Sequence, residues 1–156
     1  MAQLGEPAAG ADVTIDAAPD AVYALITDLP TLASLGEEVS SMQWRKGTSA
    51  QPGAVFKGEN RNGSRKWTTT CTVTEAVPGS AFAFDVSYLG MPIARWRYDI
   101  EGVDGERCRV TEQTWDRRPA WFRPAGGVAT GIKDRAGANS AHIKATLRRL
   151  KDRAEK

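Results

Sequence analysis

The chain has 156 residues, of which 41% are hydrophobic and 26% charged, and it carries 21 basic against 19 acidic side chains. This length fits one ordinary domain, which buries about 70% of its unfolded surface and so forms a sizeable core without disulfides or metal. The near-balance of charge argues against nucleic acid or a membrane surface as the main partner.

Cys71 and Cys108 are the only two cysteines and fall in separate predicted strands, so we expect free, partly buried thiols. The start of the chain lacks a basic segment followed by an apolar run. No stretch approaches the roughly 20 apolar residues of a membrane span. We therefore expect a cytoplasmic protein without stable membrane insertion, and leave its oligomeric state open between a monomer and a weak dimer.

The first part of the chain predicts a strand followed by two short helices. Residues 1–10, rich in Gly, Pro and Ala, predict a flexible lead-in to one domain over 11–156. Alternation of apolar and polar residues over 13–15 indicates a strand. Pro19, followed by an acid, is typical of a helix start, and a second helix is predicted over 31–35.

From about residue 39 to residue 115 the pattern changes to six strands joined as a meander. Five turn signals separate the strands: Pro52-Gly53, Asn62-Gly63, Pro78-Gly79, Leu89-Gly90 and Asp104-Gly105. In the clearest strand, apolar residues alternate with charged ones: Ala94, Trp96, Tyr98 and Ile100 against Arg95, Arg97, Asp99 and Glu101. A sheet with one charged face and one apolar face needs another element to cover the apolar face.

The C-terminal stretch supplies that cover. From about residue 125 to residue 155 it has no proline, and helical spacing connects Val128, Ile132, Ala136, Asn139, Ile143, Leu147 and Leu150. A helix of about 28 residues is about 42 Å long. The sequence therefore predicts an α+β fold, in which a curved seven-stranded antiparallel sheet (β-α-α-β6-α) wraps around a long C-terminal helix.

Several short motifs resemble the Bet v 1/START-like (SRPBCC) superfamily, and more narrowly its bacterial polyketide cyclase/dehydrase-like branch. They are Val13-Thr14-Ile15-Asp16-Ala17-Ala18-Pro19-Asp20-Ala21-Val22-Tyr23, Thr27-Asp28-Leu29-Pro30, Pro52-Gly53-Ala54-Val55-Phe56-Lys57-Gly58, Phe82-Ala83-Phe84, Trp96-Arg97-Tyr98 and Val110-Thr111-Glu112. The resemblance implies a helix-grip fold with a cavity between the concave sheet face and the last helix. It leaves the reaction open, because such folds include cyclases, lipid carriers, hormone receptors and co-chaperones.

The alternation of each strand predicts which residues would line such a cavity. The apolar candidates on strands are Trp44, Phe56, Trp67, Phe84, Tyr88, Trp96 and Tyr98, and those nearer the C-terminus are Trp121, Ile132 and Ile143. The alternative is that the same side chains fill a solid core, which is the usual place for aromatic residues on an inner face. The segment 117–124 is either a lid over the cavity mouth or a tether for the helix.

Polar residues interrupt the apolar face at Asn60, Glu112, Thr114 and Asn139. A buried carboxylate without a partner is costly, so Glu112 should find a donor or become protonated. Two interpretations stay open: these groups bind the polar end of a ligand, or they are satisfied internally, for example Glu112 by Arg135 or by a tyrosine hydroxyl.

Two residues are candidates for a catalytic role. Glu112 and Tyr98 are candidate acid–base groups for cyclisation next to an enolisable ketone, but no dedicated catalytic pair is evident. His142, the only histidine, falls one position off the apolar stripe and is predicted to lie exposed or beside it. One histidine and the absence of nucleotide-binding motifs predict no metal and no cofactor.

The prediction from sequence is thus a protein that binds a hydrophobic small molecule, either lipid-like or similar to an aromatic polyketide. Two alternatives stay open: a polyketide cyclase or dehydratase that uses the same cavity, and a protein-interaction module whose cavity is only structural.

Overall fold

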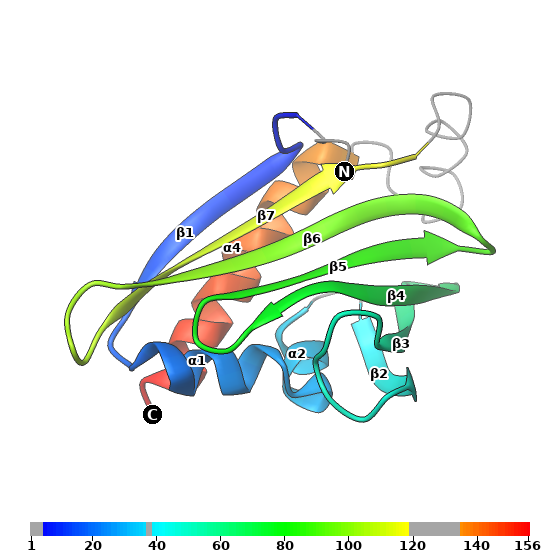
Figure 1. Ribbon diagram of the computed structural model, residues 1–156. Coiled ribbons are helices and arrows are strands. Elements are labelled where there is room, and N and C mark those ends of the chain that lie inside the picture. Colours follow the sequence, from blue (N-terminus) through cyan, green and yellow to red (C-terminus); the bar gives the residue numbers. More distant parts are fainter. Residues whose placement is uncertain (1–4, 37–38, 119–134) are drawn as a thin grey trace.

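The computed structural model describes residues 5–36, 39–118 and 135–156, except the side chains of 135–138. The elements run in the predicted order of strand, two helices, six strands and a C-terminal helix (Figure 1). They are β1 (Ala9–Ile15), α1 (Pro19–Ile26), α2 (Leu29–Leu35), β2 (Val39–Lys46), β3 (Val55–Asn62), β4 (Arg65–Val77), β5 (Ala81–Tyr88), β6 (Met91–Gly102), β7 (Cys108–Asp116) and α4 (Arg135–Ala154).

Three boundaries differ from the sequence prediction or lie beyond what the structure describes. β1 begins at Ala9, so it includes the last two residues of the predicted flexible lead-in. α2 begins at Leu29, earlier than predicted, because the Asp28 carboxylate caps the helix by accepting from the Thr31 N–H at 3.2 Å. The predicted helix over 125–134 lies outside the described residues, and α4 is described from Arg135 onward.

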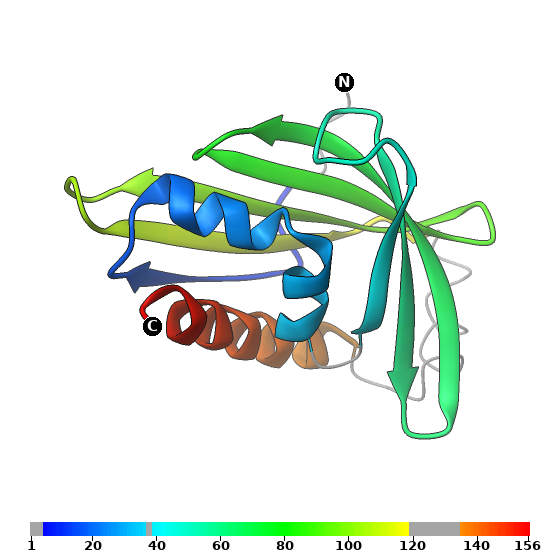
Figure 2. The ribbon, with the colours of Figure 1, turned by 90° about the horizontal axis from the view of Figure 1, so that it is seen from below.

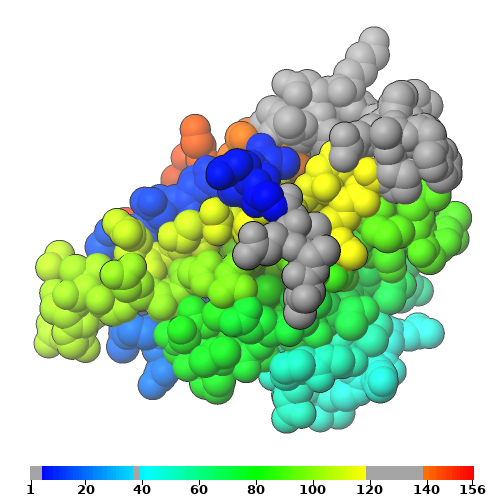
Figure 3. All heavy atoms as spheres, turned by 45° about the horizontal axis from the view of Figure 1, so that its top comes forward, coloured from blue at the N-terminus to red at the C-terminus, as the bar shows by residue number. Residues whose placement is uncertain are grey.

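The seven strands form one antiparallel sheet in the order β1-β7-β6-β5-β4-β3-β2. Strands β2 to β7 follow one another as a meander, and β1 pairs with β7, so that α1 and α2 connect the two edge strands. Figure 2 shows the sheet curving around α4. In Figure 3 its strands form one continuous surface, from β1 (blue) through β7 and β6 (yellow and yellow-green) to β5 and β4 (green).

The β5–β6 turn shows how the hairpins close. Leu89 and Gly90 both have positive φ angles, 51° and 81°. Two-residue hairpin turns favour this left-handed geometry, because its twist matches that of the strands. Glycine adopts it freely, whereas leucine does so at a cost. Leu89 is also almost fully exposed, at 89%.

The apolar core lies between the concave face of the sheet and the apolar stripe of α4. Ile143, Leu147 and Leu150 are buried there, together with residues of β1, α1 and α2. The Thr146 hydroxyl also donates to the Leu35 carbonyl at 3.3 Å, which ties α4 to the end of α2. None of the described helices has the length and apolar character needed to cross a membrane.

The convex face of the sheet carries the predicted charges, and they pair with one another. Asp85 and Arg95 stand opposite each other in register on β5 and β6, and Arg95 Nε lies 2.6 Å from Asp85 Oδ1. Arg97 forms ion pairs with both Glu75 and Asp99. The alternation of β6 therefore separates an ionic face from an apolar one, as its sequence predicts.

Candidate functional site

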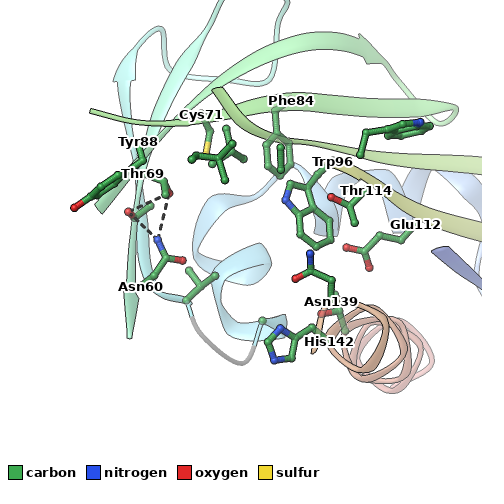
Figure 4. A pocket seen from close by; sticks show the side chains of 18 of the residues that line it. Asn60, Thr69, Cys71, Phe84, Tyr88, Trp96, Glu112, Thr114, Asn139 and His142 are labelled. Carbon is green, nitrogen blue, oxygen red and sulfur yellow. Dashed lines mark hydrogen bonds between the residues drawn. The ribbon is translucent and has the colours of Figure 1, made fainter. Parts of the chain in front are cut away.

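A cavity of about 280 Å³ lies between the concave face of the sheet and α4 (Figure 4). Strands β3 to β7 supply most of its wall, and α4 closes it with Asn139, His142 and Thr146. These three residues recur at helical spacing beside the apolar stripe that packs into the core. α4 thus covers the core with one stripe and the cavity with the neighbouring one.

Nine of the predicted ligand-binding residues line this cavity: Asn60, Trp67, Phe84, Tyr88, Trp96, Tyr98, Glu112, Thr114 and Asn139. Their side chains come from β3, β4, β5, β6, β7 and α4, which are distant in sequence. The structure therefore brings together five of the apolar candidates and all four polar ones. Figure 4 shows the Trp96 ring between the Asn60 and Glu112 sides of the cavity.

Three candidates are placed elsewhere. Phe56 and Ile143 are fully packed in the core, with 0% and 1% exposure. Trp44 packs against Phe56 in a T-shaped arrangement, with ring centroids 5.6 Å apart, and lines a separate groove beside Leu29 and Pro30. Alternation identifies the inner face correctly for the strand residues, but it does not tell how far along the sheet the cavity extends, and α2 packs against this edge. Trp121 and Ile132 lie outside the described residues.

The cavity also includes residues that sequence reasoning did not select. His142, which we predicted to lie exposed or beside the apolar stripe, is half-buried and lines the wall next to Asn139 (Figure 4). Thr69 and Cys71 of β4 line it as well. The i, i+3, i+7 spacing of Asn139, His142 and Thr146 was the available signal on the helix.

One side of the cavity is built around Glu112. It lies in the middle of β7, opposite Tyr98 of β6 in register, and both side chains are only 3% exposed. The neighbouring Thr114 hydroxyl donates to the Arg95 carbonyl at 3.0 Å, so its proton is already used in a hydrogen bond to the backbone. Glu112 Oε1 is fully buried and has no hydrogen-bond partner among the described residues.

The electrostatics of Glu112 follow from these surroundings. Burial raises the pKa of its carboxyl to about 8, and a hydrogen bond with the Tyr98 hydroxyl offsets part of the rise. The pKa of Tyr98 is itself raised well above its ordinary value, first by burial and then by Glu112. Glu112 is therefore mostly a neutral carboxylic acid at pH 7. Two internal partners for Glu112 were considered from the sequence. The Tyr98 hydroxyl is one of them, but it leaves Glu112 Oε1 without a partner among the described residues. The other, the Arg135 side chain, lies outside the described part.

The opposite side of the cavity carries an amide. Asn60 Nδ2 donates to Thr69 Oγ1 at 3.2 Å and to the Gly58 carbonyl at 3.3 Å (Figure 4). A side chain at position 58 would approach Thr69 Oγ1 to 3.0 Å, which is why glycine suits this position. The arrangement fixes the Asn60 amide on the cavity wall.

Two further polar or reactive groups of the wall, Cys71 and Arg118, have their chemistry limited by their surroundings. Burial raises the pKa of the Cys71 thiol to about 12, although a hydrogen bond with Thr69 opposes the rise. Such a thiol is a poor nucleophile at neutral pH. Arg118 is held by Asp116 through Nε at 3.0 Å and Nη2 at 2.9 Å.

Sequence comparison places these features in a known family. Residues 9–155 match the family described as "Polyketide cyclase / dehydrase and lipid transport". The chain belongs to this family. No curated protein matches the sequence.

Solved structures of other proteins have the same fold as this chain. The di-domain aromatase/cyclase StfQ from the steffimycin biosynthetic pathway is 14% identical, with a TM-score of 0.71 over 94% of this chain and 49% of StfQ. The chain thus spans about half the length of StfQ. The aromatase/cyclase Zhui from Streptomyces sp. R1128 is 17% identical, with a TM-score of 0.68 over 94% of this chain and 92% of Zhui.

A third similar structure is the polyketide-cyclase-like protein Cgl2372 from Corynebacterium glutamicum. It is 22% identical, with a TM-score of 0.62 over 94% of this chain and 91% of that protein. At these identities the likeness supports the helix-grip fold, and function has to be argued from the cavity itself.

Proposed function

We propose that this protein binds a hydrophobic small molecule, lipid-like or similar to an aromatic polyketide, in the cavity between the sheet and α4. The observation that carries the proposal is a cavity of about 280 Å³ whose wall is mainly apolar and aromatic, with polar groups on two sides. This is the usual composition of a small-molecule site, in which apolar surface supplies affinity and a few polar groups fix orientation. The volume is close to the lower end of the range for such sites.

Occupancy is the first test of this proposal. Native mass spectrometry of the purified protein should detect a retained hydrophobic adduct, and the neutral dye Nile red should bind with a rise in fluorescence. Trp67 and Trp96 line the cavity, so binding should also change tryptophan emission. A clean apo mass together with no binding of the dye would count decisively against a ligand site.

A pair of variants localises the binding. Ala94→Phe adds a ring to the cavity wall on β6 and should weaken Nile red binding about 10-fold, because the ring occupies the space of the ligand. Thr72→Phe adds the same ring to an exposed position on β4, on the other face, and should leave binding unchanged. Equal effects of the two variants would place the dye outside the cavity.

Acid–base catalysis is the second candidate function, and one observation favours it. A carboxyl whose pKa is about 8 can both give and take a proton near neutral pH, and Glu112 has this property inside the cavity. Cyclases and dehydratases of polyketides act beside enolisable ketones, whose α-protons such a group could move.

Proton exchange tests this second function without knowledge of the natural substrate. The wild-type protein should accelerate exchange of the α-protons of methyl nonyl ketone with deuterated water, followed by NMR. Glu112→Gln should abolish the acceleration while still binding the ketone. An unchanged exchange rate in wild type and variant would leave the protein as a binding protein only.

A further inference from the structure

The polar groups around Glu112 restrict what the buried end of a ligand can be. β1 and β6 flank β7, so the Glu112 backbone lies inside the sheet with Ala11 on one side and Tyr98 on the other. The side chain therefore emerges on the concave face, and Figure 4 shows the carboxyl pointing into the space between Trp96 and Asn139. A ligand atom that reaches this point faces the Glu112 carboxyl.

The arginines of the neighbouring strand β6 are kept away from this carboxyl. Arg95 and Arg97 alternate with Trp96 and Tyr98 and therefore lie on the convex face, where acidic side chains hold them. The guanidinium of Arg118, at the cavity wall, donates from Nε and Nη2 to the Asp116 carboxylate. Glu112 forms no ion pair among the described residues, so none of them offers a cation to an anionic ligand that reaches this carboxyl.

The hydrogen bonds available at Glu112 determine which kind of ligand end it favours. Glu112 has one donor, the Tyr98 hydroxyl, while Oε1 has no partner in the described part of the chain. A protonated carboxyl can donate its O–H to a carbonyl oxygen and so satisfy a buried group. A second carboxylate in the same place would have to share a proton with Glu112 or leave two like charges in contact.

We propose that the cavity selects ligands whose buried end is a neutral hydrogen-bond acceptor, such as a ketone or ester carbonyl, over ligands that end in a carboxylate. This inference rests on the proposed function and narrows its ligand class: free fatty acids are disfavoured, and uncharged carbonyl compounds with an apolar body are favoured. Glu112 is the residue that makes the distinction, and Tyr98 holds its carboxyl in place.

Two probes with the same alkyl chain test the effect of the buried end of the ligand by itself. Methyl nonyl ketone and decanoic acid differ only in whether the carbonyl carbon bears a methyl or a hydroxyl group. At pH 7 the wild-type protein should bind the ketone at least about 10-fold more tightly than decanoate, measured by displacement of Nile red. A 10-fold ratio corresponds to about 1.4 kcal/mol.

Variants assign the preference to Glu112. Glu112→Gln keeps a neutral donor and should keep the preference for the ketone. Glu112→Leu removes the donor and should reduce the ratio of the two affinities towards one, mainly by weakening ketone binding. Asn60→Leu changes the other side of the cavity and should shift both affinities by a similar factor, so that their ratio stays as in the wild type.

The outcomes separate this inference from the proposed function. Equal or tighter binding of decanoate by the wild-type protein would overturn the selectivity while leaving the cavity a ligand site. A ketone preference that survives in Glu112→Leu would also overturn it, because another group would then be responsible. If neither probe displaces Nile red and the dye itself does not bind, the proposed function fails together with the inference.

Discussion

The two faces of the sheet treat charged side chains in different ways, although neighbouring residues of the same strands supply both. On the convex face, Asp85 stands opposite Arg95 in register and forms an ion pair with it at 2.6 Å. On the concave face, Glu112 stands opposite Tyr98 and has only a hydroxyl as partner among the described residues. The pleat of the sheet places the described arginines of β6, Arg95 and Arg97, on the face opposite Glu112.

The largest expected effect concerns the packed part of the concave face. Phe56→Ala should lower the free energy of unfolding by about 3–5 kcal/mol, because it leaves a cavity where a fully buried ring packs. That ring contacts Phe84, with centroids 5.1 Å apart. Urea denaturation measures the change. Lys57→Ala, the next residue and on the other face, should change stability by less than about 0.5 kcal/mol.

Similar losses of stability for Phe56→Ala and Lys57→Ala would contradict the difference between the two faces. They would mean that the concave side is loosely packed around Phe56 as well as at the cavity.

The second prediction concerns the pH dependence of stability. The pKa of Glu112 rises from 4.5 to about 8 in the folded protein. Between these two pH values the unfolded chain has released the proton that the folded chain still holds, so the free energy of unfolding must fall as pH rises. The contribution is fully present below pH 4.5 and is lost by about pH 8. The free energy of unfolding should therefore fall by up to about 1.4 kcal/mol per pH unit, which makes about 3 kcal/mol by pH 7.

Glu112→Gln isolates this contribution, since the amide does not titrate. The difference in unfolding free energy between variant and wild type, measured in urea at several pH values, should grow with pH in favour of the variant. Glu101→Gln, an exposed position on the convex face, should give a curve parallel to the wild type. A parallel curve for Glu112→Gln would show that Glu112 is ionised in the folded protein.

Sequence reasoning was accurate where local patterns determine structure. The alternation in β6 separated Trp96 and Tyr98 from Arg95 and Arg97, and the Asn62-Gly63 signal marked the turn between β3 and β4. These predictions succeed because the side-chain period of a strand is two, which assigns each residue to a face.

The same reasoning was less accurate for the extent of the cavity. Phe56 and Trp96 share the inner face of the sheet, yet Phe56 is packed in the core and Trp96 lines the cavity. The difference depends on which helix covers each end of the sheet, and that is a tertiary contact between segments far apart in sequence. His142 entered the cavity wall for the same reason, because the rotation of α4 about its axis is set by packing.

The third prediction concerns the partly buried ion pair of the convex face. Asp85 and Arg95 are about one-fifth exposed, and Arg117 also approaches Asp85 at 3.0 Å. A double-mutant cycle with Asp85→Ala and Arg95→Met should give a coupling of about 0.5–1 kcal/mol, since solvent screens the charges. The coupling should decrease when the salt concentration rises. A coupling of several kcal/mol would contradict the interpretation of this face as a solvated one.

The smallest effect is expected for Glu101 and Arg109, which are also opposite each other in register on β6 and β7, the two strands that carry Tyr98 and Glu112. Their charged atoms are 3.8 Å apart, and their side chains are 76% and 53% exposed, so water competes fully for both groups. A double-mutant cycle with Glu101→Gln and Arg109→Met should show no coupling within error. A clear coupling here would mean that register pairing itself stabilises charges on this sheet. Its absence, next to the pH-dependent effect at Glu112, would show that burial decides the energetics of a cross-strand pair, because the same two strands and the same kind of pairing are involved in both cases.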